Sequence, residues 1–190
     1  MKRIVGVVLA GGLSRRYGSP KAFAKLESRF FYEIAVDVLK ELCDEIVVVT
    51  RQEFVNRFPA SLTVIVDVKE FGGLGPLAGI YSAMEAIKAD QYVVLPCDMP
   101  YMKREVMRNL LVRHKKGTTA VVAEGKQHPL VSIWDAETKA TIQEALRNHQ
   151  LRVIQTLTAC SVTWIEGDTL TKDTARTFVN VNTPNRLERI

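Results

Sequence analysis

The chain has 190 residues, of which 47% are hydrophobic and 25% charged, as is usual for a soluble globular protein. This length predicts one domain spanning residues 1–190, with a core large enough to be stable. A net charge of +5 permits an acidic partner such as nucleic acid, an anionic membrane or a phosphorylated small molecule, without choosing among them.

Apolar, β-branched runs predict strands, and apolar residues at helical spacing predict helices. In chain order the predicted elements are a strand at 4–10, a helix at 30–43, strands at 45–50 and 62–67, a helix at 77–89 opened by Pro76, a strand at 91–98, a helix at 103–116, strands at 118–124 and 128–135, a helix at 136–149, a strand at 161–167 and, in the tail 178–190, a short strand and a helix capped by Thr183 with Pro184 at its first position. Near-continuous apolar strands alternating with helices are typical of a mostly parallel sheet covered on both faces. We therefore expect an α/β protein with three layers, α/β/α.

The position of a ligand site follows from this fold class. In open α/β sheets, ligands bind beyond the carboxyl ends of the strands. The segments to search are therefore 10–21, 50–52, 67–76 and 97–100.

The cysteines and the N-terminal segment favour a reduced compartment. Cys43, Cys97 and Cys160 are widely spaced and form no CxxC pair, so neither a zinc knuckle nor a redox pair is indicated. The apolar run that follows the first residues is short, and no apolar stretch approaches the roughly 20 residues that span a bilayer. We expect a cytoplasmic protein that does not enter a membrane.

The segment LAGGLSRRYGSPKAF, residues 9–23, follows the first predicted strand and carries the features of an anion site. Gly11 and Gly12 allow the backbone to approach a ligand closely and to adopt positive φ, and successive N–H groups in such a turn bind anions. Arg15 and Lys21 add positive charge, whereas Arg16 is left without a role. Neither GxxxxGK[ST] nor GxGxxG is present, so the alternative is a tight strand exit with solvated cations.

Four segments in order carry a family resemblance: LAGGLSRRYGSPKAF, GPLAGI (75–80), LPCDMPYM (95–102) and FVNVNTP (178–184). The first resembles the signature of the NTP-transferase-like nucleotidyltransferases, and together they resemble the molybdenum cofactor guanylyltransferases. The resemblance implies a Rossmann-like nucleotidyltransferase fold. It also implies Mg²⁺-dependent transfer of GMP from GTP to the phosphate of molybdopterin, which forms molybdopterin guanine dinucleotide and pyrophosphate.

The resemblance also implies roles for individual residues. It makes Arg15, Lys21 and Asp98 catalytic and Asp98 the magnesium ligand. The residues that it implies for GTP binding are Leu9, Ala10, Gly11, Gly12, Arg15, Lys21, Asp67, Leu77, Gly79 and Asp98. For the two aspartates, an ordinary turn or strand-end residue is the alternative.

Fewer features of the sequence indicate which residues bind the acceptor, molybdopterin. His128 lies at a strand start, where a lone histidine is more often structural, and the resemblance suggests a contact with the pterin. Asn180 and Asn182 alternate with valines, so both amides are expected on one strand face, where the resemblance places the active site. Thr50 departs from the asparagine that some relatives have there, which weakens any inference about the base.

Other functions remain open at this point. The nearest alternative is a molybdopterin cytidylyltransferase or another sugar- or alcohol-phosphate nucleotidyltransferase. A nucleotide-binding module without catalysis, acting in cofactor delivery, is a further alternative. Other proteins of molybdenum cofactor biosynthesis are possible partners. Nucleic acid is not expected, because no basic helix with interleaved aromatic residues is present.

Overall fold

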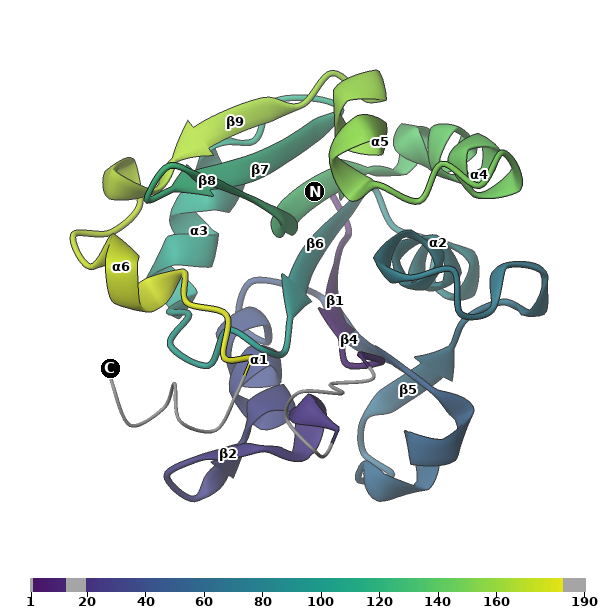
Figure 1. Cartoon of the computed structure of the whole chain (residues 1–190), viewed down its shortest axis with the longest axis horizontal. Helices are drawn as coiled ribbons and strands as arrows, with labels where there is room; N and C mark the ends of the chain where they lie inside the picture. Colours follow the sequence, from purple (N-terminus) through teal and green to yellow (C-terminus); the bar gives the residue numbers. More distant parts are fainter. Residues whose placement is uncertain (1, 13–19, 183–190) are drawn as a thin grey trace.

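A computed structural model of the chain describes residues 2–12 and 20–182. Within these residues seven strands form one sheet, and a two-stranded hairpin lies beside it (Figure 1). The strands, in the order in which they lie side by side, are β5 (Thr63–Val66), β4 (Glu45–Thr50), β1 (Ile4–Leu9), β6 (Gln91–Pro96), β8 (Lys126–Asp135), β7 (Thr118–Ala123) and β9 (Thr163–Glu166). Only β8 runs antiparallel to its neighbours, so the prediction of a mostly parallel sheet is confirmed.

Helices cover both faces of the sheet, which confirms the three layers (Figure 1). The helices are α1 (Phe31–Leu39), α2 (Pro76–Ala86), α3 (Arg104–Arg113), α4 (Lys139–Arg147), α5 (Val153–Ala159) and the short α6 (Thr174–Thr177), with single 3₁₀ turns at η1 (Lys21–Phe23), η2 (Gln52–Arg57), η3 (Lys69–Phe71), η4 (Ala136–Thr138) and η5 (Gly167–Thr169). Buried residues of α1 and α3 join one hydrophobic core, and those of α2, α4 and α5 join a second core on the other face.

The strand sequences explain why two cores form. Successive side chains of a strand point to opposite faces, so Val7 packs in the core beside α2 and Val8 in the core beside α1. Val47 and Val48 of β4 divide in the same way. Because both faces are covered, both sets of positions are apolar, which is the pattern seen in the sequence.

Two local features differ from the sequence predictions, and one prediction falls outside the described residues. The hairpin of β2 (Lys25–Leu26) and β3 (Arg29–Phe30) was not predicted, because its turn has Glu27 at φ 57° instead of a glycine. The strand predicted in the tail is wrong: residues 179–182 belong to no strand, and Val181 N–H donates a lone backbone bond of 2.9 Å to the carbonyl of Asp98. The predicted tail helix at 184–190 lies outside the described residues.

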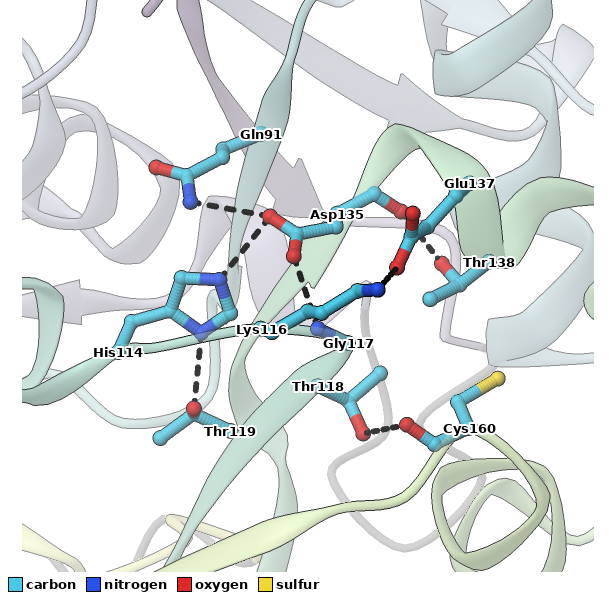
Figure 2. Close-up of polar contacts among 10 residues, drawn as sticks. All are labelled: Gln91, His114, Lys116, Gly117, Thr118, Thr119, Asp135, Glu137, Thr138 and Cys160. Carbon is cyan, nitrogen blue, oxygen red and sulfur yellow. Dashed lines mark hydrogen bonds and ion pairs between the residues drawn. The ribbon is translucent and has the colours of Figure 1, made fainter.

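A cluster of buried polar groups fastens the amino-terminal end of β6 to the end of β8 (Figure 2). The Asp135 carboxylate accepts hydrogen bonds from Gln91 Nε2 at 3.0 Å, His114 Nε2 at 3.0 Å and the Gly117 backbone N–H at 2.8 Å. Burial alone raises the pKa of Asp135, but these donors outweigh it and hold the pKa below the ordinary value. Figure 2 also shows His114 Nδ1 bonded to the Thr119 hydroxyl, so both ring nitrogens have partners.

The ligand site is expected at the other end of the strands, away from the Asp135 cluster. β1, β4, β5 and β6 are mutually parallel, so their carboxyl ends meet at one edge. Among residues 2–12 and 20–182, no helix combines the length and the apolar character needed to cross a membrane.

Candidate active site

A cavity of about 390 Å³ lies at the carboxyl ends of these strands. Its walls come from the ends of four strands (β1, β4, β5 and β6), the middle of β8, η1, the start of α2 and the segment after α6. The lining residues are Leu9, Gly11, Gly12, Lys21, Ala22, Val49, Thr50, Arg51, Asp67, Gly73, Gly75, Pro76, Gly79, Pro96, Cys97, Asp98, Leu130 and Asn180. Most of the residues singled out in the sequence therefore share one cavity, as the strand-end rule predicts.

Lys21 and Asp98 meet in this cavity although 77 residues separate them in the sequence. The Lys21 ammonium donates to Asp98 Oδ2 at 2.9 Å and to Asn182 Oδ1 at 2.5 Å. Their side chains keep only 15% and 20% of their full exposure, so water screens this ion pair weakly. Lys21 begins η1 and Asp98 follows β6, so the ion pair connects these two segments in the wall of the cavity.

Asp98 has one oxygen that the rest of the described chain leaves unsatisfied. Its Oδ1 is buried and has no hydrogen-bond partner. A buried carboxylate oxygen without a donor is costly, which fits a cation ligand at this position. Within residues 2–12 and 20–182 no group of three or more His, Cys, Asp or Glu side chains gathers, so Asp98 would share a metal with ligand oxygens and water.

The glycines act differently from the sequence expectation. Gly11 and Gly12 do not adopt positive φ; in this region Gly73 and Gly75 do so, at 78° and 87°. Gly79 is the position where space is short, because a Cβ there would lie 3.0 Å from Leu9 Cδ2. The absence of a side chain at Gly79 lets α2 begin directly against the ends of β1 and β4.

Asp67 and Arg51 form the far end of the cavity, after β5 and β4. Asp67 Oδ2 accepts the Gly73 backbone N–H at 3.0 Å. Burial raises the pKa of Asp67, while this hydrogen bond and the nearby Arg51 act in the opposite direction. Arg51 Nε in turn donates to Glu53 Oε1 at 2.5 Å.

Two predicted nucleotide residues, Ala10 and Leu77, do not line the cavity, and the position of a third is not described. Arg15 lies outside the described residues. Ala10 and Leu77 are 2% and 0% exposed as whole residues and pack in the two cores, so neither offers surface to a ligand in this structure.

Comparison with known proteins identifies the family. Residues 6–161 match the family model described as "MobA-like NTP transferase domain". The chain belongs to this family. It is 38% identical to a protein of Geobacillus sp. (strain WCH70) named "Probable molybdenum cofactor guanylyltransferase", over 100% of this chain and 99% of the relative. A protein of the same name from Bacillus subtilis (strain 168) is 37% identical over 94% and 90% of the two chains.

Solved structures support the fold assignment. The crystal structure of molybdopterin-guanine dinucleotide biosynthesis protein A from Archaeoglobus fulgidus superimposes with a TM-score of 0.81 at 24% identity, covering 97% of this chain and 95% of that one. The 2-C-methyl-D-erythritol 4-phosphate cytidylyltransferase of Thermus thermophilus gives 0.69 at 17% identity, with 96% and 95% covered. The MobA-like chain is therefore a nucleotidyltransferase with a Rossmann-like α/β fold.

The three residues predicted for the acceptor of this MobA-like protein lie apart. Asn180 lines the cavity, and Asn182 is bonded to Lys21. His128 is not part of the lining; its ring packs 5.3 Å from that of Phe178, and burial lowers its pKa. The expectation that both asparagines project from one strand face is wrong, because no strand forms there.

Some of the residues that line the cavity of the MobA-like chain were not identified from the sequence. Leu130 and Pro96 are apolar and carry no motif of their own, so only the folded sheet brings them to the cavity. Cys97 also lines it, but burial raises the pKa of its thiol to about 12. The thiol therefore stays protonated and is a poor nucleophile.

Proposed function

We propose that the protein transfers GMP from GTP to the terminal phosphate of molybdopterin. An oxygen of that phosphate attacks the α-phosphorus of GTP, the bond from this phosphorus to the bridging oxygen breaks, and pyrophosphate leaves. The names of the relatives that match over the whole chain support this reaction. The nucleophile is already an anion, so no general base or covalent intermediate is needed.

The observation that carries the proposal is the meeting of Lys21 and Asp98 in one cavity at the strand ends. Two anionic substrates repel one another, and negative charge grows on the departing pyrophosphate. Positioned, partly dehydrated charges oppose both effects. In this mechanism the ammonium of Lys21 moves from Asp98 to the phosphate oxygens once the substrates occupy the cavity.

Asp98 is the side chain that would hold Mg²⁺, since its Oδ1 lacks any donor within the described chain. A magnesium ion at this carboxylate supplies charge neutralisation for phosphate oxygens. The protein contributes the position of the carboxylate, fixed by the backbone bond from Val181. Gly11 and Gly12 leave the backbone at the end of β1 open to the triphosphate, and Arg15 is proposed to bind the pyrophosphate portion.

Asp67 supports guanine as the base. The Watson–Crick edge of guanine carries two adjacent N–H donors, which a carboxylate accepts together. Cytosine offers one donor beside an acceptor, so it matches a carboxylate less well. Arg51 lies at the same end of the cavity and can face a base carbonyl.

Two alternatives are separated from this proposal by direct assay. Pyrophosphate release is measured with each nucleoside triphosphate in turn, with molybdopterin or a sugar phosphate as the acceptor, and with Mg²⁺ present or removed by chelation. We expect release only with GTP, molybdopterin and Mg²⁺ together. Release with CTP would establish a cytidylyltransferase, and GTP binding without any release would establish a binding module.

The cellular setting completes the proposal. Cys43, Cys97 and Cys160 form no disulfide among the described residues, which supports the reducing cytoplasm. Other proteins of molybdenum cofactor biosynthesis are proposed partners, because the dinucleotide product has to reach the enzymes that use it.

A further inference from the structure

β6 and β8 separate near the cavity, and a proline explains why. The two strands pair from Gln91 opposite Asp135 to Val94 opposite Ser132, where the ladder ends. Continued in the same register, it would bring Pro96 opposite Leu130. Proline has no N–H to donate, so Pro96 cannot complete the next hydrogen-bonded pair of this ladder.

The pairing of β8 with its other neighbour is interrupted at the same place. Ala120 of β7 faces Ser132, yet the next residue, Val121, faces His128. The three residues between them, 129–131, therefore have no partner in β7 and form a bulge. A bulge redirects side chains, often next to an active site.

The bulge directs one side chain into the cavity. Leu130 is half-buried and lines the cavity, whereas its neighbour Val131 is fully buried in the core on the other face. Leu130 lines the same cavity as Pro96 and Cys97, neither of which has a charged side-chain group of the Asp, Glu, Lys or Arg type.

The order of the strands in the sheet indicates which of the two substrates lies next to Leu130. Asp67 follows β5, Asp98 follows β6 and is paired with Lys21 of η1, and Leu130 lies on β8. The reacting phosphorus belongs near the charged pair in the middle. With the base at Asp67, the acceptor then extends toward β8.

We propose that the β8 bulge builds the acceptor end of the cavity, with Leu130 as the apolar wall against which the flat, uncharged pterin ring of the acceptor packs. This inference rests on the proposed function, since it takes molybdopterin as the acceptor. In this inference the Leu130 side chain contributes to the selection of the acceptor and does not contribute to nucleotide binding.

Steady-state kinetics of Leu130→Ala and of the milder Leu130→Val test the proposal, with molybdopterin and GTP varied separately. Removing apolar contact from a substrate pocket costs tenfold or more. We expect the KM for molybdopterin to rise about tenfold in Leu130→Ala and less in Leu130→Val, while kcat and the KM for GTP change less than twofold. The Kd of GTP, measured calorimetrically without acceptor, should also stay unchanged.

Leu151→Ala is the matched control. Leu151 is a half-buried leucine packed against the same core, but it does not line the cavity. Its variant should keep both KM values, and melting temperatures show whether each variant folds. A GTP Kd weakened as much as the KM for molybdopterin would place Leu130 at the nucleotide end and overturn the inference, as would unchanged values throughout. Failure of the proposed function is a separate result, seen when the unmodified protein forms no dinucleotide.

Discussion

The pairing of Lys21 with Asp98 predicts that one substitution, Lys21→Met, has opposite effects on metal binding and on turnover. In the structure the Lys21 ammonium neutralises the Asp98 carboxylate, which is proposed to hold a divalent cation. A metal ion that arrives without nucleotide therefore competes with Lys21. Methionine keeps the length of the side chain but removes its charge.

The size of the effect follows from the geometry. Unit charges about 4 Å apart interact by about 4 kcal/mol at an effective dielectric constant near 20. Water still reaches the 15% and 20% of these side chains that stay exposed, and this screening is why we take half of the value, about 2 kcal/mol, as the relief that the substitution gives to a bound cation. This corresponds to roughly thirtyfold tighter binding. Turnover should instead fall by roughly 10²–10³, because the substitution removes a positioned charge at the phosphates.

Electron paramagnetic resonance measures the first effect, because free Mn²⁺ gives a sharp signal that is lost on binding. The titration is done without nucleotide, and pyrophosphate release gives the turnover. Lys25→Met is the control for a change in net charge, since Lys25 lies on the hairpin over the Phe30 ring and does not line the cavity. Mn²⁺ binding by Lys21→Met that equals or falls below that of the unmodified protein would refute the competition.

Three further predictions concern the aspartates. Asp98→Ala should abolish Mn²⁺ binding and lower turnover by roughly 10²–10³, and near-normal turnover with bound metal would locate the metal elsewhere. Asp67→Asn should reduce the preference for GTP over CTP, measured as a ratio of kcat/KM, by roughly tenfold, because an amide offers only one acceptor group; an unchanged ratio would remove Asp67 from base recognition. Asp135→Asn should lower the free energy of unfolding in urea by about 2–3 kcal/mol at pH 7, because the carboxylate accepts three hydrogen bonds. Since the folded pKa of Asp135 is depressed, its contribution is present above the unfolded pKa of about 4 and is lost as pH falls through the folded value, so the two proteins should converge in acid; a constant difference down to the lowest pH would contradict this.

The layers of the fold could be predicted because local patterns determine them. Val7 and Val8 alternate between two cores, and apolar residues on both faces of a strand already imply helices on both sides. The same pattern located the site, since Lys21, Asp67 and Asp98 each follow a predicted strand or its loop.

What could not be predicted depends on contacts between distant segments. Leu130 reaches the cavity where β8 loses its pairing with β6 after Val94 and bulges away from β7, and no local pattern reveals that geometry. Asn182 was assigned to a strand face, but it accepts from an ammonium 161 residues away. The hairpin at Glu27 was missed because a residue with a side chain takes a backbone conformation that usually signals glycine.

The amide of Asn182 has a consequence for how the protein is made. The ribosome synthesises Lys21 early, and 161 residues must follow before its partner exists. A nascent polypeptide can thus assemble β1, β4 and β6 while its active centre is still incomplete. Premature termination between β9 and Asn182 would yield a chain that contains every strand of the sheet but lacks a side-chain oxygen that holds the ammonium.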